Sequence, residues 1–172
     1  MVAFGLSGQT ICIDRFEASR GDGGIPSSVA GALPWVSITP EQASAACATV
    51  GKRLCTEPEW ETACRGPSAF TYPYGNTYSG MACNGLDRSV GALGPTGSFA
   101  GCQGGLTGLW DMSGNAYEFT GATCTTAMCR VRGGSFRSGS GAGFLRCTTG
   151  FDFTTPGGGD NAVGFRCCRN QN

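Results

Sequence analysis

The sequence predicts an α+β domain in which two helices pack on a small, twisted, mostly antiparallel sheet, with long loops cross-linked by disulfides. Helix-start signals occur at only two places, both in the first half of the chain. The 172 residues include 30 glycines, which favour tight turns and positive φ angles over helix. They also include 11 cysteines and no histidine. Because no linker or internal repeat is visible, we expect one domain over residues 1–172.

The first element that the sequence predicts is a strand. Apolar and polar residues alternate over Ile11–Glu17, which is the pattern of a half-buried strand. The segment that follows, Arg20–Ala32, is rich in Gly, Ser and Pro and is predicted to be a loop.

Two helices follow, and each carries a capping signature. The first has Thr39 as its N-cap, Pro40 at the first helical position and Gln42 three residues after the cap. The second repeats this pattern with Thr56 as N-cap and Glu59 closing the capping box. A glycine follows each helix as its C-terminal stop, at Gly51 and Gly66.

After the second helix, short apolar clusters alternate with Gly, Asn and Pro. This pattern indicates short strands joined by ordered loops. The clusters are Leu109–Met112, Ala116–Phe119, Val131–Phe136, Phe144–Cys147 and Val163–Cys168.

The charge balance excludes some classes of partner. Twelve Lys and Arg oppose twelve Asp and Glu, so the chain has no net charge. We therefore expect no nucleic-acid groove and no basic membrane-binding face. No apolar stretch is long enough to span a membrane.

The cysteines indicate an oxidising compartment. Without histidine or a Cys-x-x-Cys pair, a zinc site is not favoured. Cytosolic disulfides are rare, so we expect a secreted, periplasmic or cell-surface protein; the alternative is a cytosolic protein with buried free thiols. The N-terminal segment Met1–Ser7 lacks the features of a signal peptide. We thus expect that a signal was removed or that this is one module of a larger chain or assembly. The odd cysteine count leaves one thiol free or paired with another chain.

A series of short motifs, in order over roughly residues 10 to 169, is specific as a whole. It resembles the formylglycine-generating-enzyme, or sulfatase-modifying-factor, family, which is a variant of the C-type lectin fold. That family includes oxidases that make formylglycine in sulfatases, iron-dependent sulfoxide synthases, accessory domains, and hypervariable binding proteins of retroelements. The motifs are Pro34–Ser37, Gly51–Glu61, Tyr72–Gly75, Cys83–Asn84, Gly108–Phe119, Arg132–Phe136 and Gly164–Cys167.

The resemblance also implies what chemistry the chain lacks. The oxidases bind copper through a cysteine pair just after the Arg132–Phe136 motif, and these positions fall at about Ser138 and at Ala142 or Gly143. Such residues do not replace two thiolates for Cu(I). The sulfoxide synthases need histidine-bound iron, and the chain has no histidine. We therefore expect no catalytic residues and no copper.

Calcium is the cofactor that the resemblance still allows. Glu118 would supply the carboxylate, in a loop whose backbone carbonyls are hard ligands suited to Ca²⁺. The alternative is that Glu118 caps backbone amides or pairs with an arginine. A second, less favoured calcium site would use Asn84 and Asp87. The ligands implied for the first site are Ser113, Gly114, Asn115, Ala116 and Glu118.

The resemblance implies two long-range disulfides, Cys47–Cys167 and Cys64–Cys147. Cys83–Cys102 and Cys124–Cys129 are weaker pairings, and the second of these could instead be a redox or metal pair. Because adjacent strand side chains point to opposite faces, Cys167 and Cys168 should have different partners. Of the three cysteines that remain, Cys12, Cys55 and Cys168, we favour a bond between Cys12 and Cys168.

Two functional hypotheses follow. The first is a non-catalytic binding or structural module that recognises a glycan, peptide or partner protein through two exposed C-terminal loops, residues 137–144 and 150–161. A retroelement-diversified binding protein is one form of it. The second is a copper-dependent oxidase with a rearranged site. For the first, the alternative at Phe151 and Phe153 is that both belong to the core. The candidate ligand-binding residues are Arg137, Ser138, Phe144, Phe151, Asp152, Phe153, Asp160 and Asn161.

Overall fold

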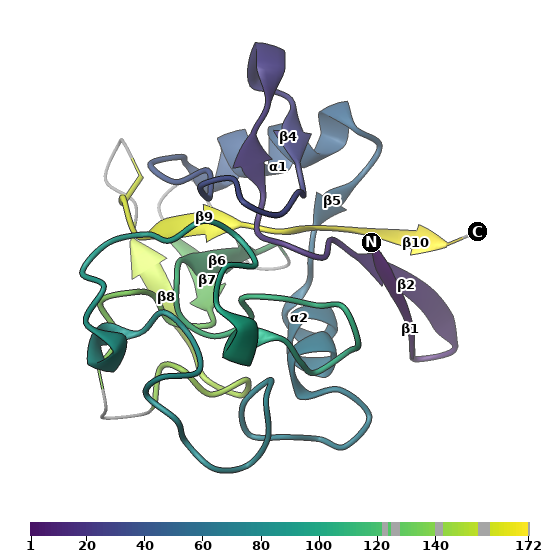
Figure 1. The fold of residues 1–172 in the computed structure, drawn as a ribbon. Helices are drawn as coiled ribbons and strands as arrows, with labels where there is room; N and C mark the ends of the chain where they lie inside the picture. The colour runs from purple at the N-terminus through teal and green to yellow at the C-terminus, as the bar shows by residue number, and fades with distance from the viewer. Residues whose placement is uncertain (122–123, 125–127, 140–142, 155–158, 172) are drawn as a thin grey trace.

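The structure is a computed structural model of the 172-residue chain, and it describes residues 1–121, 124, 128–139, 143–154 and 159–171. Two four-stranded sheets and two helices make up its framework, and long loops complete it (Figure 1). A short two-stranded ribbon, β3 (Ser19–Arg20) with β4 (Pro26–Ser27), overlaps the segment Arg20–Ala32, which was predicted to be a loop throughout. The predicted α+β class is confirmed. Among the described residues, no helix has the length and apolar character needed to cross a membrane.

The first sheet joins the two ends of the chain. Its strands lie in the order β1-β2-β10-β5 and are all antiparallel. The predicted first strand corresponds to β2, which is shorter than expected because it ends before Asp14, whose carboxylate pairs with Lys52. β1 was not predicted. The bounds are β1 (Val2–Leu6), β2 (Gln9–Ile13), β5 (Arg53–Leu54) and β10 (Cys167–Gln171).

The second sheet has the order β8-β7-β6-β9. Only β6 and β9 are parallel, so the sheets are mostly antiparallel, as predicted. Three of the predicted clusters supply strands here or in β10, but Leu109–Met112 and Phe144–Cys147 do not form strands. Trp110 makes only an isolated bridge to Gln103, and Phe144–Cys147 lies in turns and a bend. The bounds are β6 (Tyr117–Thr120), β7 (Met128–Arg132), β8 (Gly150–Thr154) and β9 (Val163–Phe165).

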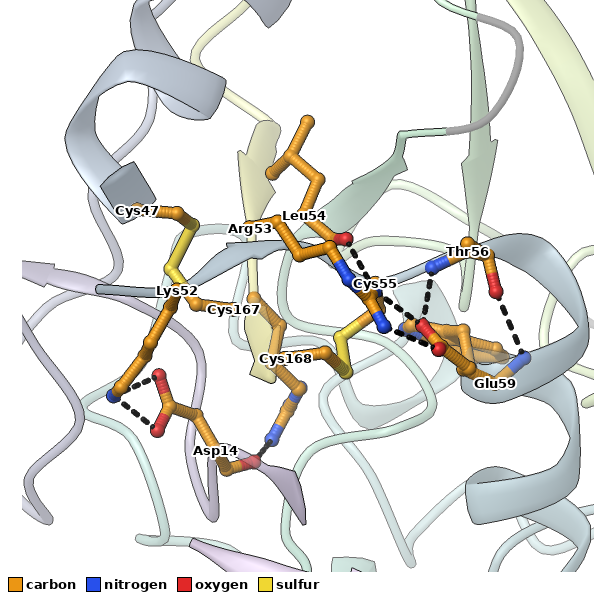
Figure 2. Close-up of a disulfide and its surroundings, with 12 residues drawn as sticks. Asp14, Cys47, Lys52, Arg53, Leu54, Cys55, Thr56, Glu59, Cys167 and Cys168 are labelled. Carbon is orange, nitrogen blue, oxygen red and sulfur yellow. Dashed lines mark hydrogen bonds and ion pairs between the residues drawn. A yellow bond between two sulfur atoms is a disulfide. The ribbon is translucent and has the colours of Figure 1, made fainter. Parts of the chain in front are cut away.

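The two helices are α1 (Pro40–Thr49) and α2 (Glu57–Arg65), and both predicted capping boxes are present. In α2 the Glu59 amide donates to Thr56 Oγ1 over 3.4 Å, and the Thr56 amide donates to Glu59 Oε2 over 2.8 Å (Figure 2). The glycines that follow, Gly51 and Gly66, have φ angles of 67° and 60°. These positive φ values end each helix where glycine has no steric penalty.

The core consists of two main clusters. The first lies between α1 and the second sheet and includes Ala43, Phe119 and Phe165. The second lies between α2 and the first sheet and is centred on Trp60, which is fully buried. Each sheet therefore packs against one helix, and the long loops extend from this framework.

Five disulfides connect these parts, and four of them match the predicted pairs: Cys47–Cys167, Cys64–Cys147, Cys83–Cys102 and Cys124–Cys129. The prediction for Cys12 was wrong. Cys168 bonds Cys55, and Cys12 is a buried free thiol (Figure 2).

Strand register explains this correction. Cys168 lies opposite Ile13 in β2, and Cys12 lies opposite Arg169. Neighbouring side chains alternate between the faces of a sheet, so Cys12 and Cys168 point to opposite faces. On the other side of β10, Cys168 lies opposite Arg53, and Cys55 lies two residues beyond Arg53 on the same face. Cys55 is therefore the partner that the sheet places within reach.

Candidate functional site

A row of aromatic rings lies where the ligand-binding surface was predicted. We call Tyr117, Phe144, Phe151 and Phe153 the aromatic row. Phe151 and Phe153 share one face of β8, and their ring centroids lie 6.5 Å apart. Phe151 also contacts the rings of Tyr117 and Phe144, at 5.1 and 5.5 Å.

The aromatic row is partly core and partly surface. Phe151 and Phe153 are half-buried and pack against the first core cluster, as the core alternative predicted. Phe144 is 49% exposed and extends the row to the surface. Aromatic rings that are held by a sheet and open on one side can stack on a ligand at little entropic cost.

A polar group, which we call the polar border, lies near the Tyr117 end of the aromatic row, because its members adjoin Ser138, which contacts the Tyr117 hydroxyl, and Ala162, whose carbonyl accepts the Tyr117 amide. The exposed Arg137 guanidinium lies 3.4 Å from the Asp160 carboxylate, and it also donates to the Asn161 side chain. Asp160 is fixed in turn, because its carboxylate accepts the Ala162 amide over 2.7 Å. The structure therefore brings together three of the predicted residues, Arg137, Asp160 and Asn161.

Two other predicted binding residues are not part of this surface. Ser138 is only 3% exposed, and its Oγ lies 2.7 Å from the Tyr117 hydroxyl and accepts the Ser135 amide. Asp152 alternates with Phe151 and Phe153 along β8, so it points to the opposite face, 3.5 Å from Arg130. Residues that are adjacent along the strand thus lie on opposite faces of the sheet. Thr155, in the same predicted range, lies outside the described residues.

The positions that the resemblance assigns to copper hold no thiolates. Ser138 is buried with its hydroxyl engaged as above, and burial raises the pKa of the Tyr117 hydroxyl beside it. Gly143 has no side chain, and Ala142 lies outside the described residues. The nearest cysteine along the chain, Cys147, is bonded to Cys64. This donor set does not fit a copper ion.

The loop predicted to bind calcium is engaged with protein partners instead. The Glu118 carboxylate accepts hydrogen bonds from Trp60 Nε1 and from Arg166 Nη2, each over 2.7 Å. The Asn115 amide group donates to Glu17 over 2.6 Å. A calcium ion at Glu118 would lie beside a fully buried guanidinium. The alternative in which Glu118 pairs with an arginine is therefore the observed one, and the carboxylate that was predicted to bind calcium already has protein partners.

At the second predicted calcium site, Asn84 Oδ1 is buried with no hydrogen-bond partner among the described residues. Asn84 donates to the Asn115 side chain and to the Ala92 carbonyl, whereas the Asp87 carboxylate accepts the Tyr78 hydroxyl over 2.5 Å. In the described part of the chain, no group of three or more His, Cys, Asp or Glu residues is arranged to hold a metal.

These contacts give a prediction for calcium. Because the Glu118 carboxylate is already paired, adding calcium chloride to protein treated with a chelator should leave the thermal unfolding midpoint unchanged. A ligand that binds the native state would raise the midpoint by mass action. A calcium-dependent rise in the parent protein that is lost in Glu118→Gln would show instead that the loop binds the ion.

A buried charged cluster was missed by the sequence analysis. It consists of Glu17, Asp111, Glu118 and Arg166, none of them more than 2% exposed. Burial, and then the neighbouring Glu118 carboxylate, raise the pKa of Asp111 to about 6, although the Gly97 amide and Arg166 oppose this. Burial also raises the pKa of Glu17 well above its ordinary value. The only signal in the sequence was acidic residues within strongly apolar motifs.

Comparison with known proteins gives consistent matches. The sulfatase-modifying factor enzyme 1-like domain family matches residues 11–171. The mouse protein named inactive C-alpha-formylglycine-generating enzyme 2 is 34% identical over 152 residues, which cover 78% of this chain and 48% of that protein. The formylglycine-generating enzyme of Mycobacterium tuberculosis is 36% identical over 100 residues, or 51% of this chain and 32% of the enzyme. The chain spans about half the length of the mouse protein, or less for the bacterial enzyme.

The fold has a match among solved structures as well. Treponema denticola variable protein 1 superimposes with a TM-score of 0.73 at 18% identity, over 92% of this chain and 84% of that protein. Similarity at this level of identity establishes the fold alone. The predicted formylglycine-generating-enzyme variant of the C-type lectin fold is confirmed.

Proposed function

We propose that this chain, which belongs to the sulfatase-modifying factor enzyme 1-like domain family, is a non-catalytic module that binds a ligand or partner through the aromatic row and its polar border. The observation that carries this proposal is the state of Ser138. Its hydroxyl occupies one copper-ligand position implied by the family resemblance, and it is buried against Tyr117. The similarity to a relative named as inactive supports the same conclusion.

The surface favours a ligand with both flat apolar and polar groups. Phe144 offers an exposed ring, and Arg137, Asp160 and Asn161 offer donors and acceptors near the Tyr117 end of the aromatic row. Glycans and peptides combine these features. The five disulfides support an extracytoplasmic location, because such bonds persist in oxidising compartments.

A diversified binding protein is a second form of this proposal. The fold match to a protein named variable protein 1 supports it, and the predicted binding ranges lie in the C-terminal part of the chain. Sequencing of the locus in related strains is the test. Substitutions concentrated at the exposed positions of residues 137–144 and 150–161 would favour this form over a fixed specificity.

The catalytic half of the proposal is tested by an aldehyde assay. The purified chain, supplied with copper and oxygen, should not convert the cysteine of a sulfatase-derived peptide to formylglycine, because no thiolate pair is present to bind Cu(I). The M. tuberculosis enzyme serves as the positive control. Aldehyde detected by mass spectrometry above the copper-only background would favour the rearranged-oxidase alternative.

The binding half is tested with glycan arrays and a displayed peptide library. Ligands selected on the parent protein should lose affinity by at least about tenfold when the exposed ring is removed in Phe144→Ser, as for an aromatic hot spot. Leu33→Ser is the matched control, because Leu33 is a similarly exposed apolar residue at 59% on a different loop. Equal losses in both variants, or none in Phe144→Ser, would contradict this surface.

A further inference from the structure

We propose that the Cys124–Cys129 disulfide is an exchangeable redox site, opened by thiols that enter the hollow beside α1. The pair is bonded across a separation of five residues. Cys129 lies in β7 and is fully buried, whereas Cys124 follows the end of β6 and is half-buried. A nucleophile from solvent therefore reaches Cys124.

Exposure distinguishes Cys124 from every other bonded cysteine of the chain. The other nine are buried, none with more than 4% of its surface exposed. Thiol–disulfide exchange requires direct access of a thiolate to one of the two sulfurs. Four disulfides are therefore protected by the fold, and only the Cys124–Cys129 bond has an accessible end.

The accessible end opens into a hollow of about 620 Å³. One wall is the outer face of α1, which presents the small side chains Ser44, Ala45 and Ala48. Leu54 and Gly121 also line the hollow, together with Cys124. Gly121 is required there, because a Cβ at this position would lie 2.8 Å from the Leu54 Cβ. The hollow has room for a small thiol or for the cysteine of an extended peptide.

The fold depends little on this bond, so it can open in the native state. A disulfide stabilises mainly by closing a loop in the unfolded chain, and the effect falls with loop length. The loop closed here is far shorter than that of Cys47–Cys167, whose separation is 120 residues. The hairpin is held independently by the pairing of β6 with β7, from Glu118 with Arg132 to Thr120 with Arg130.

Thiols are the reductant in the exchange reaction. A thiolate in the hollow attacks Cys124 Sγ, the S–S bond breaks, and Cys129 leaves as a thiolate that takes a proton from water. A second thiolate then attacks the incoming sulfur of this mixed disulfide. The products are the disulfide of the two reductant thiols and the reduced Cys124 thiol. Two electrons pass from the two thiols to the protein disulfide.

The test is stepwise reduction of the native protein. Samples equilibrated with increasing dithiothreitol are alkylated without denaturant and mapped by mass spectrometry. Cys124 and Cys129 should be modified at a dithiothreitol concentration at least tenfold lower than Cys83 and Cys102, with near-ultraviolet circular dichroism unchanged. Cys83–Cys102 is the matched control, because it has the next shortest separation, 19 residues, but is buried.

A variant identifies the sulfur that is attacked. In Cys129→Ser, oxidised glutathione should form a mixed disulfide at Cys124 in the folded protein, whereas in Cys124→Ser the buried Cys129 should react at least tenfold more slowly. Prior opening of any other disulfide would overturn the proposal. So would modification of Cys124 and Cys129 only together with loss of the native circular dichroism signal.

Discussion

Arg166→Met is expected to lower the free energy of unfolding by about 3–5 kcal/mol, the range found when one partner of a buried ion pair is removed. The Arg166 guanidinium is fully buried and lies 2.7 Å from the Glu118 carboxylate. It also donates to the carbonyls of Asp14 and Trp110, which come from two distant parts of the chain. Methionine fills a similar volume but leaves the Glu118 carboxylate buried and without its cation.

Urea denaturation measures this effect. Arg169→Met is the matched control: Arg169 is exposed on β10, and its replacement should change stability by less than about 0.5 kcal/mol. Adding Glu118→Gln to Arg166→Met should recover part of the loss, because the buried charge is then removed. A loss below about 1 kcal/mol in Arg166→Met would contradict the importance of this pair.

Stability is expected to fall as the pH rises from about 4 to about 7, because buried carboxyl groups hold protons that the unfolded chain releases. The pKa of Asp111 is raised from 3.8 to about 6, and that of Glu17 is raised in the same direction. Between pH 3.8 and about 6, Asp111 holds more protons in the folded state than in the unfolded state. The free energy of unfolding therefore decreases as the pH rises. For Asp111 alone, the difference between the unfolded-state and folded-state pKa corresponds to about 3 kcal/mol of stability, which is fully lost above the folded-state pKa.

Asp111→Asn isolates this contribution. Asparagine keeps an oxygen for the Gly97 amide, and it tolerates the φ angle of 58° at this position. The variant should show a flatter dependence of stability on pH, and it should be more stable than the parent at pH 7. Asp22→Asn, at an exposed site, is the control. An unchanged pH profile in Asp111→Asn would show that this carboxyl does not hold a proton in the folded state, despite its burial and the nearby charge of Glu118.

Local sequence patterns predicted the helices, because a capping box involves residues only three positions apart. Both boxes, at Thr39 and Thr56, are present. The strands were harder, since a short strand is defined by its neighbour. β8 has alternating residues, but it was expected to be an exposed loop, and its strand character comes from pairing with β7. The Cys12 error has the same origin, because the register of β10 determines which face each cysteine occupies.

The sequence predicted only part of the candidate site. Arg137, Asp160 and Asn161 do come together, as expected of loops near one edge of a sheet. The pairing of Glu118 with Arg166 was left as one alternative, and the rest of the buried cluster was not foreseen. Glu118 and Arg166 are 48 residues apart, and only the parallel pairing of β6 with β9 brings them together. No local pattern carries that information.

Cu(I) titration shows whether this chain keeps the family fold without the family's copper ligands. The native, oxidised protein is titrated against a colorimetric Cu(I) chelator at neutral pH, with the M. tuberculosis enzyme as the reference. The chelator should retain all the copper, because ten cysteines are bonded and the eleventh, Cys12, is a single buried thiol. Transfer of one equivalent of copper to the native protein, with two thiols protected from alkylation, would contradict this expectation.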